Sequence, residues 1–172
     1  MVKVDDHVFH VPKSYLIEGT IPWLPSSQSA GLKFLINPGV RPEEQMIVTI
    51  ESSATTCHPK TPPVSSQLST ACSSARRNEE FSPLAKYTVE KVIMDSDPTQ
   101  WEYRLRIADG NLGSVVASCY LLSEKKGLCT ALGNYGDLVY SLGLRDEDMP
   151  RLAMIHKKIH DLLRAWERAG SL

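Results

Sequence analysis

Four cysteines carry the most definite chemistry in this chain: Cys57, Cys72, Cys119 and Cys129. Cysteine side chains can ligate metals, act as nucleophiles or pair as disulfides. The chain contains no Cys-x-x-Cys pair and no Cys/His finger spacing, so the sequence indicates neither a zinc site nor thioredoxin-like chemistry. The even number and the two short separations along the chain favour disulfides at these four positions.

A disulfide is possible in each of the two pairs of cysteines that lie close together in the sequence. Cys119 and Cys129 flank residues 123–127, a predicted hairpin loop whose five residues would make the two cysteines diagonal neighbours on one sheet face. Cys57 and Cys72 bracket a Pro-, Ser- and Thr-rich stretch that would gain most from a covalent tie. Four reduced thiols remain the alternative, since a domain of this size can fold without bridges, and the connectivity stays open. Bridges would indicate an oxidising compartment, with the export signal removed and Met1 added.

Two pairs of histidines are close enough in the sequence to be considered as metal ligands. His7 and His10 would lie on opposite faces of a strand, where they cannot chelate one ion. His156 and His160 lie four residues apart on a predicted helix, a spacing found in zinc sites. Lys157 follows the first of them where a metalloprotease has glutamate, and no third ligand is evident. We therefore expect partly exposed histidines on the flank of the helix and no metal.

Catalytic motifs are absent from the sequence. There is no Gly-x-Ser-x-Gly elbow, no phosphate-binding Gly-x-x-x-x-Gly-Lys, no Gly-x-Gly-x-x-Gly and no His-Glu-x-x-His. We therefore predict neither an enzyme nor a bound cofactor. A hydrolase stays a weaker alternative, and it would need a serine or cysteine beside a histidine backed by a carboxylate.

The net charge of the chain argues against two classes of partner, nucleic acid and anionic membranes. The 172 residues carry a formal net charge of -1, and the pI is about 6.5, which provides no field to attract nucleic acid or an anionic membrane. No stretch is long and apolar enough for a transmembrane helix, and the first six residues lack the features of a signal peptide. We expect no nucleic-acid partner.

The segment from 87 to 130 predicts three consecutive antiparallel strands. Apolar and charged residues alternate through 101–107, an Asp-Gly-Asn turn follows, and 114–122 forms the next strand. A three-residue, bulged loop would place Leu105 opposite Val115 and Tyr103 opposite Ala117. Residues 87–94 supply the third strand of this meander.

Further strands are predicted before and after the meander. Residues 32–36 and 45–50 have strand composition, 6–12 suggest an edge strand, and 15–17 suggest a second short strand. Residues 136–144 suit either a strand or an irregular return to the sheet.

A C-terminal helix completes the predicted fold. Helical spacing relates six apolar residues, with Asp146, Glu147, Asp148 and Pro150 before them and Gly170 after them; the six are Leu152, Ile155, Ile159, Leu162, Leu163 and Trp166. The fold class is α+β: an antiparallel sheet, curled or split into two layers, with this long helix packed on it. We expect one domain, residues 1–172, with a long Ser/Thr/Pro-rich loop at about 52–82.

Two loops are the predicted partner-binding surface. Residues 19–27 place Trp23 among prolines and glycine, as rigid binding loops often do, although Trp23 and Leu24 could instead cap the core. The second loop, residues 57–80, carries paired opposite charges. The predicted contact residues are Ile21, Trp23, Leu24, Arg76, Arg77, Glu79 and Glu80.

Three stretches are distinctive: VDDHVFHVPKSYL at 4–16, IPWLP at 21–25, and the ending that starts YSLGLRDEDMP at 140–150 and runs through Trp166. They resemble immunity proteins of bacterial type VI secretion systems, in particular those that guard against antibacterial lipase effectors, and the resemblance implies a location in the periplasm. The resemblance implies a non-enzymatic protein that binds a cognate phospholipase toxin one-to-one and blocks its active site or its access to the membrane. A lipid anchor in the precursor would suit such a protein. The alternative is a small envelope protein that binds a ligand or a secretion component without inhibiting a toxin.

Overall fold

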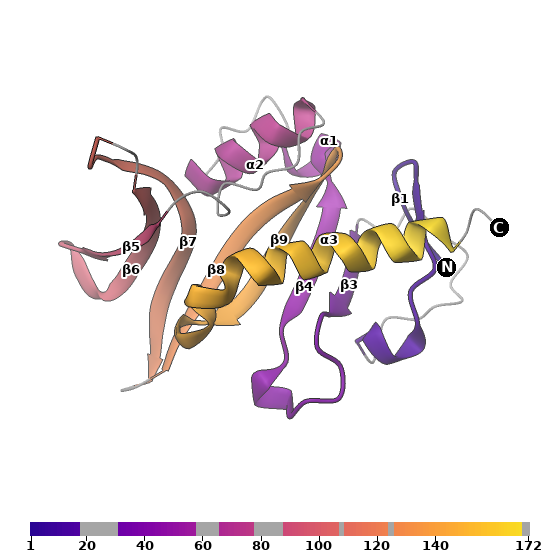
Figure 1. Ribbon diagram of the computed structural model, residues 1–172, viewed down its shortest axis with the longest axis horizontal. Helices are drawn as coiled ribbons and strands as arrows, with labels where there is room; N and C mark the ends of the chain where they lie inside the picture. Colours follow the sequence, from indigo (N-terminus) through magenta and orange to yellow (C-terminus); the bar gives the residue numbers. More distant parts are fainter. Residues whose placement is uncertain (18–30, 58–65, 78–87, 107–108, 124–125, 170–172) are drawn as a thin grey trace.

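Seven antiparallel strands form one sheet in the computed structural model, which describes residues 1–17, 31–57, 66–77, 88–106, 109–123 and 126–169. Their order is β3 (Gly31–Leu35), β4 (Ile47–Ser52), β9 (Leu138–Arg145), β8 (Lys126–Tyr135), β7 (Leu112–Ser123), β6 (Asp97–Arg106) and β5 (Val89–Met94). From β5 to β9 each strand pairs with the next one along the chain. The predicted meander is therefore present, and the undecided 136–144 segment is strand β9. Figure 1 shows β5, β6 and β7 curving away from β8 and β9, and the sheet stays open.

Helices lie on both faces of this sheet, so the predicted α+β class is confirmed. The long helix α3 (Leu152–Arg168) crosses the strands in Figure 1. It packs on the face that carries Tyr140, Leu142 and Leu144 of β9. The alternate residues of β9 point the other way, and Val139 among them packs against helix α2 (Ser66–Arg76).

The main core fills the space between α3 and the sheet. The helix contributes its predicted apolar stripe, in which Ile159 and Leu163 have no solvent exposure, and Phe34 and Val48 face it from β3 and β4. Trp166 packs edge-on against Phe34, with ring centroids 4.9 Å apart. The acidic residues expected at the helix start, and Pro150, lie just before α3 in the 3-10 turn η4 (Asp146–Arg151).

The predicted loop at 52–82 contains two helices, which corrects that expectation. Helix α1 (Ser53–Thr56) follows β4 directly, with the Ser52 side chain accepting a hydrogen bond from the Ala54 amide. Helix α2 buries Ala71, Cys72 and Ala75. These small residues recur at helical spacing among serines and threonines, so the stripe is too weakly apolar to reveal the helix by composition. Residues 58–65 and 78–82 of this segment lie outside the described residues.

Two disulfides join the four cysteines, as predicted. Cys57 pairs with Cys72, which ties α2 to the end of α1, and Cys119 pairs with Cys129 across β7 and β8. The second pair is directly opposite in the ladder, with a Cα–Cα distance of 4.0 Å, rather than diagonal. A register shift between Leu121 and Ser123, and a β8 that already begins at Lys126, account for the difference.

The hairpin between β6 and β7 follows the prediction in part. Tyr103 opposes Ala117, as expected, but Val115 opposes Arg104 rather than Leu105. A bulge after Tyr103 shifts the register by one residue there. The bulge was expected in the loop, whereas the structure places it inside the ladder.

The N-terminal segment forms its own two-stranded sheet of β1 (Val2–Val4) and β2 (His7–Phe9). The predicted edge strand is therefore β2, and the His10 amide donates to the Trp166 carbonyl at 3.0 Å, which docks it on the end of α3. The strand predicted at 15–17 is wrong. Pro12 is instead the N-cap of the 3-10 turn η1 (Lys13–Tyr15), after which Leu16 makes a single bridge to Phe34.

Asp146 fastens the curved β5–β6 part of the sheet to the start of η4. Its Oδ1 accepts from the Trp101 indole at 2.9 Å and from the Tyr103 hydroxyl at 2.8 Å, and its Oδ2 accepts from the Lys91 ammonium at 2.9 Å. Burial would raise the pKa of the Asp146 carboxyl, but these three donors outweigh it and lower that pKa. The charged carboxylate therefore holds three side chains from two strands, β5 and β6, in place.

Candidate functional site

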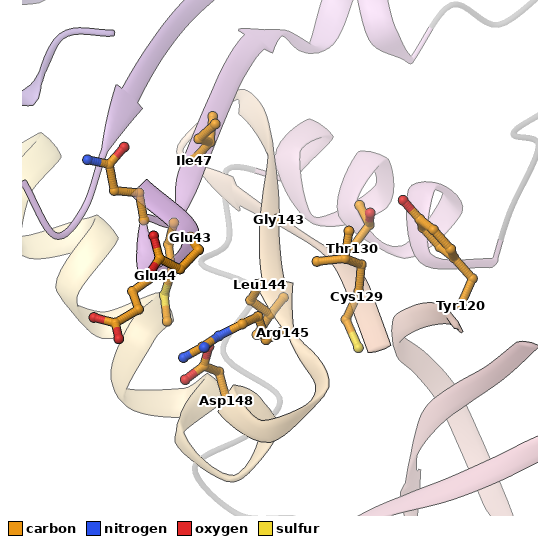
Figure 2. Close-up of a pocket in the computed structure, with 13 residues that line it drawn as sticks. Glu43, Glu44, Ile47, Tyr120, Cys129, Thr130, Gly143, Leu144, Arg145 and Asp148 are labelled. Carbon is orange, nitrogen blue, oxygen red and sulfur yellow. The ribbon is translucent and has the colours of Figure 1, made fainter. Parts of the chain in front are cut away.

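The sheet face that carries α2 is covered at one end and open at the other. The α2 end holds Leu132 and Val139. At the opposite end a pocket of about 260 Å³ opens between β4, β9, β8 and β7. Figure 2 shows Ile47 and Tyr120 on opposite sides of Gly143 and Thr130. We define this hollow as the open-face pocket.

Strand register builds the pocket from two adjacent rows of residues. In the first row Gly143 of β9 pairs with Ile47 of β4 and with Thr130 of β8. In the second row Leu128 of β8 pairs with both Arg145 and Tyr120. Because Gly143 has no side chain, the middle of the first row is recessed, and a Cβ built there meets no atom within 4 Å.

A second pocket of about 320 Å³ adjoins the first around the start of α3. Arg145, Asp148, Glu44 and Met46 line both pockets, so together they form one surface at this edge of the sheet. Its other apolar lining comes from Ile36, Val40, Met154 and Ile155. Drug-sized ligand sites usually enclose about 300–1,000 Å³, so each pocket lies at or below the small end of that range.

Apart from Lys158, the charged side chains that line the two pockets are paired with other charged side chains. Arg41 bonds Glu44 of the 3-10 turn η2 (Pro42–Glu44) and lies near Glu43. Arg151 bonds the buried Asp148. Arg145 meets Glu147 at 2.7 Å, and its Nε lies 3.6 Å from Asp148, beyond hydrogen-bond distance. The rim is therefore polar but has no strong charge of one sign.

The two helix histidines are buried, which corrects the prediction of partly exposed residues. His156 and His160 are each 7% exposed and face Tyr140 of β9. The Tyr140 hydroxyl lies 2.6 Å from His156 Nδ1 and 3.4 Å from His160 Nε2. Burial, with a smaller contribution from His160, lowers the pKa of His156 to about 4. A tyrosine thus occupies the space between them that a metal would need.

No nucleophile stands out in the part of the chain that the structure describes. All four cysteines are bonded as disulfides, so the chain has no free thiol. His7 hydrogen-bonds Asp137 at 2.7 Å and Glu167 at 2.6 Å, and neither partner can act as the nucleophile of a serine or cysteine triad. Asp146 lies near the Cys119–Cys129 pair, but a disulfide offers no thiolate to a metal. No described helix has the length and hydropathy needed to span a membrane.

Comparison with known proteins gives one similarity. No family model matches the chain, and no curated protein sequence matches it. A solved structure, Smlt3025, described as an immunity protein of the Stenotrophomonas maltophilia type IV secretion system, matches with a TM-score of 0.54 and 12% identity. The match covers 96% of this chain and 91% of that chain. At this identity the similarity shows that the two chains share a fold.

The structure does not describe most of the residues that the sequence predicts to bind a partner. Ile21, Trp23, Leu24, Glu79 and Glu80 lie outside the described residues.

The remaining two predicted contact residues, Arg76 and Arg77, are exposed at the end of α2. Arg76 donates to the Cys57 carbonyl at 3.0 Å, so it helps to dock α2. That end of α2 adjoins the Ser52 end of β4, whereas the open-face pocket adjoins Ile47, about 17 Å away at strand rise. The structure therefore does not bring these arginines to the pocket.

Sequence reasoning missed Ile47, Tyr120 and Gly143 as surface residues. A signal was available, because Met46, Ile47 and Val48 are consecutive apolar residues, as are Tyr120, Leu121 and Leu122. A half-buried strand should alternate, so an apolar residue on the solvent side marks either a second core or an exposed patch. Ile47 and Tyr120 are 44% and 48% exposed, which identifies the patch.

Proposed function

We propose that this chain is a bacterial immunity protein that neutralises a secreted toxin by binding it. The observation that carries the proposal is the fold shared with Smlt3025 over 96% of this chain, since that protein is described as a secretion-system immunity protein. The buried histidine–tyrosine cluster and the lack of a free thiol support binding rather than catalysis. Neutralisation then follows from occupying the toxin's surface and needs no chemistry in this chain.

The finer proposal concerns the toxin and the compartment. The sequence resemblance at both ends of the chain points to a type VI lipase effector, whereas the structural neighbour is described for a type IV system. We favour the lipase because the resemblance extends over several stretches of this sequence. Two disulfides support an oxidising compartment, and the periplasm is the one in which a phospholipase toxin would reach its substrate.

The direct test uses the protein encoded next to this chain's gene. The two purified proteins should form a one-to-one complex on size exclusion, and release of fatty acid from phospholipid vesicles should stop at equimolar chain. A complex without lipase activity in the partner would keep the immunity role and reject the lipase. Absence of both complex and inhibition would reject the proposed function.

The loops predicted from the sequence provide a separate test of the contact surface. If Trp23 is an anchor, Trp23→Ala should weaken binding by about 2 kcal/mol or more. The remaining predicted contacts, Ile21, Leu24, Arg76, Arg77, Glu79 and Glu80, should each give smaller losses. A lower melting temperature with unchanged affinity would instead assign Trp23 to the core.

A further inference from the structure

The strand order leaves part of one sheet face without a helix among the described residues. Val139 and Leu132 lie under α2, and the Gln67 side chain reaches Ser118 at 2.7 Å, at the β7 end of the row that contains Thr130 and Gly143. No residue of α2 lines the pocket that Gly143 and Leu128 share with Ile47 and Tyr120. A sheet face with apolar side chains normally packs against another layer.

Exposed apolar side chains gather around this uncovered area. Ile47 and Tyr120 stand at the two sides of the open-face pocket and are 44% and 48% exposed. Val40 and Met154 are exposed at the adjoining pocket. A contiguous apolar patch with a polar rim is typical of a protein-binding surface.

Pocket size and rim charge restrict what can enter. The pocket between Ile47 and Tyr120 holds about 260 Å³, which suits one or two side chains better than a drug-sized ligand. The nearby charges are already used in the Arg41–Glu44 and Arg145–Glu147 pairs. A charged group entering the pocket would lose its hydration without gaining a free counter-charge, so an uncharged group is favoured.

We infer that the open-face pocket is the docking site for the effector and receives a bulky, uncharged apolar side chain from an effector loop. The inference rests on the proposed function and specifies its surface. The apolar side chain would fill the recess above Gly143 between Ile47 and Tyr120, and the paired rim charges would surround it and exclude water.

Gly143→Trp tests the inference by filling the recess. A Cβ at this position meets no atom within 4 Å and the pocket above it holds about 260 Å³, so the variant should fold with a melting temperature close to that of the original chain. Its affinity for the protein encoded next to this chain's gene, measured by titration calorimetry, should fall by more than about 100-fold. Tyr120→Ala removes one wall, and we expect it to lower the affinity by about tenfold or more.

Ile93→Trp is the matched control, since Ile93 is 59% exposed on β5 and does not line either pocket. It should change the affinity by less than about twofold. If Gly143→Trp fails to fold, Tyr120→Ala and Ile47→Ala decide the question, because both only shorten exposed side chains.

Several results would overturn the inference. If the original chain binds and Tyr120→Ala and Gly143→Trp bind equally well, the pocket is not the docking site although the proposed function stands. A dimer of the isolated chain that Gly143→Trp dissociates would assign the surface to a second copy. Vesicles of phosphatidylethanolamine and phosphatidylglycerol that bind the chain but not Gly143→Trp would assign it to lipid. No binding by the original chain would remove the proposed function and the inference together.

Discussion

The Tyr140 hydroxyl lies 2.6 Å from His156 Nδ1 in the buried interface between β9 and α3. A neutral imidazole can accept a hydrogen bond at this nitrogen, whereas a protonated imidazole cannot. One contact between the long helix and the sheet therefore requires an uncharged His156, and this gives the stability of the fold a pH dependence.

Acidification should destabilise the protein through His156. Its pKa of about 4 in the folded chain lies below the ordinary 6.5, so the unfolded chain binds more protons between these values. The stability that depends on neutral His156 is complete above about pH 6.5 and is lost as the pH falls to about 4, by about 3 kcal/mol in total.

His156→Gln keeps a hydrogen-bonding partner for Tyr140 without a titrating ring, so urea unfolding should show a flatter stability profile across this pH range. His10→Gln makes the same substitution at an exposed histidine and is the control. An equal slope in His156→Gln and the original chain would show that His156 is not the titrating group.

His7 should contribute a pH dependence of stability opposite to that of His156. Burial would lower its pKa, but hydrogen bonds to Asp137 and Glu167 outweigh burial and raise it. A raised folded-state pKa means that the stabilisation by His7 is fully present below about pH 6.5 and disappears as the pH rises through the folded value. His7→Gln should therefore destabilise the chain more at about pH 5.5 than at about pH 8.5. A loss that is the same at both pH values would indicate packing rather than charge.

Two glycines of the sheet should respond differently to the same substitution. A Cβ at Gly133 would lie 2.5 Å from the Tyr140 ring and hydroxyl, whereas a Cβ at Gly143 meets nothing within 4 Å. Gly133→Ala should lower the free energy of unfolding by about 2 kcal/mol or more, because Tyr140 is fully buried and cannot move aside freely. Gly143→Ala should be neutral or slightly stabilising. Equal melting temperatures for the two variants would contradict the packing of Tyr140 on Gly133.

The two disulfides should protect different parts of the molecule. Cys57→Ala with Cys72→Ala opens a bridge with a sequence separation of 15 and should cost about 3 kcal/mol in unfolding free energy. Because this bridge anchors α2 itself, through Cys72, to the end of α1, hydrogen exchange should accelerate at Leu68, Ala71 and Ala75.

Cys119→Ala with Cys129→Ala is the comparison, since those residues are also held by the β7–β8 ladder. It should leave exchange in α2 unchanged. Faster exchange in α2 in both double variants, to the same extent, would show that neither bridge acts locally.

Local patterns in the sequence predicted most of the strands, the C-terminal helix and disulfides at the four cysteines, but not the connectivity of those disulfides. Alternation with period two and apolar spacing near 3.6 follow from the backbone geometry of each element, so a single segment reveals them. The α2 helix was not predicted because its buried apolar residues are alanine and cysteine, whose hydrophobicity differs little from that of the surrounding serines.

Tertiary structure alone decided the candidate site and the burial of the helix histidines. Gly143 becomes a pocket floor only because Ile47 of β4 and Thr130 of β8 pair beside it, and pairing partners this distant in the chain have no local signature. His156 and His160 occupy the flank that sequence spacing gives them, but the distance to Tyr140 on β9 turns that flank into core. The sequence determines what each element can present, and the packing of the elements decides which residues meet.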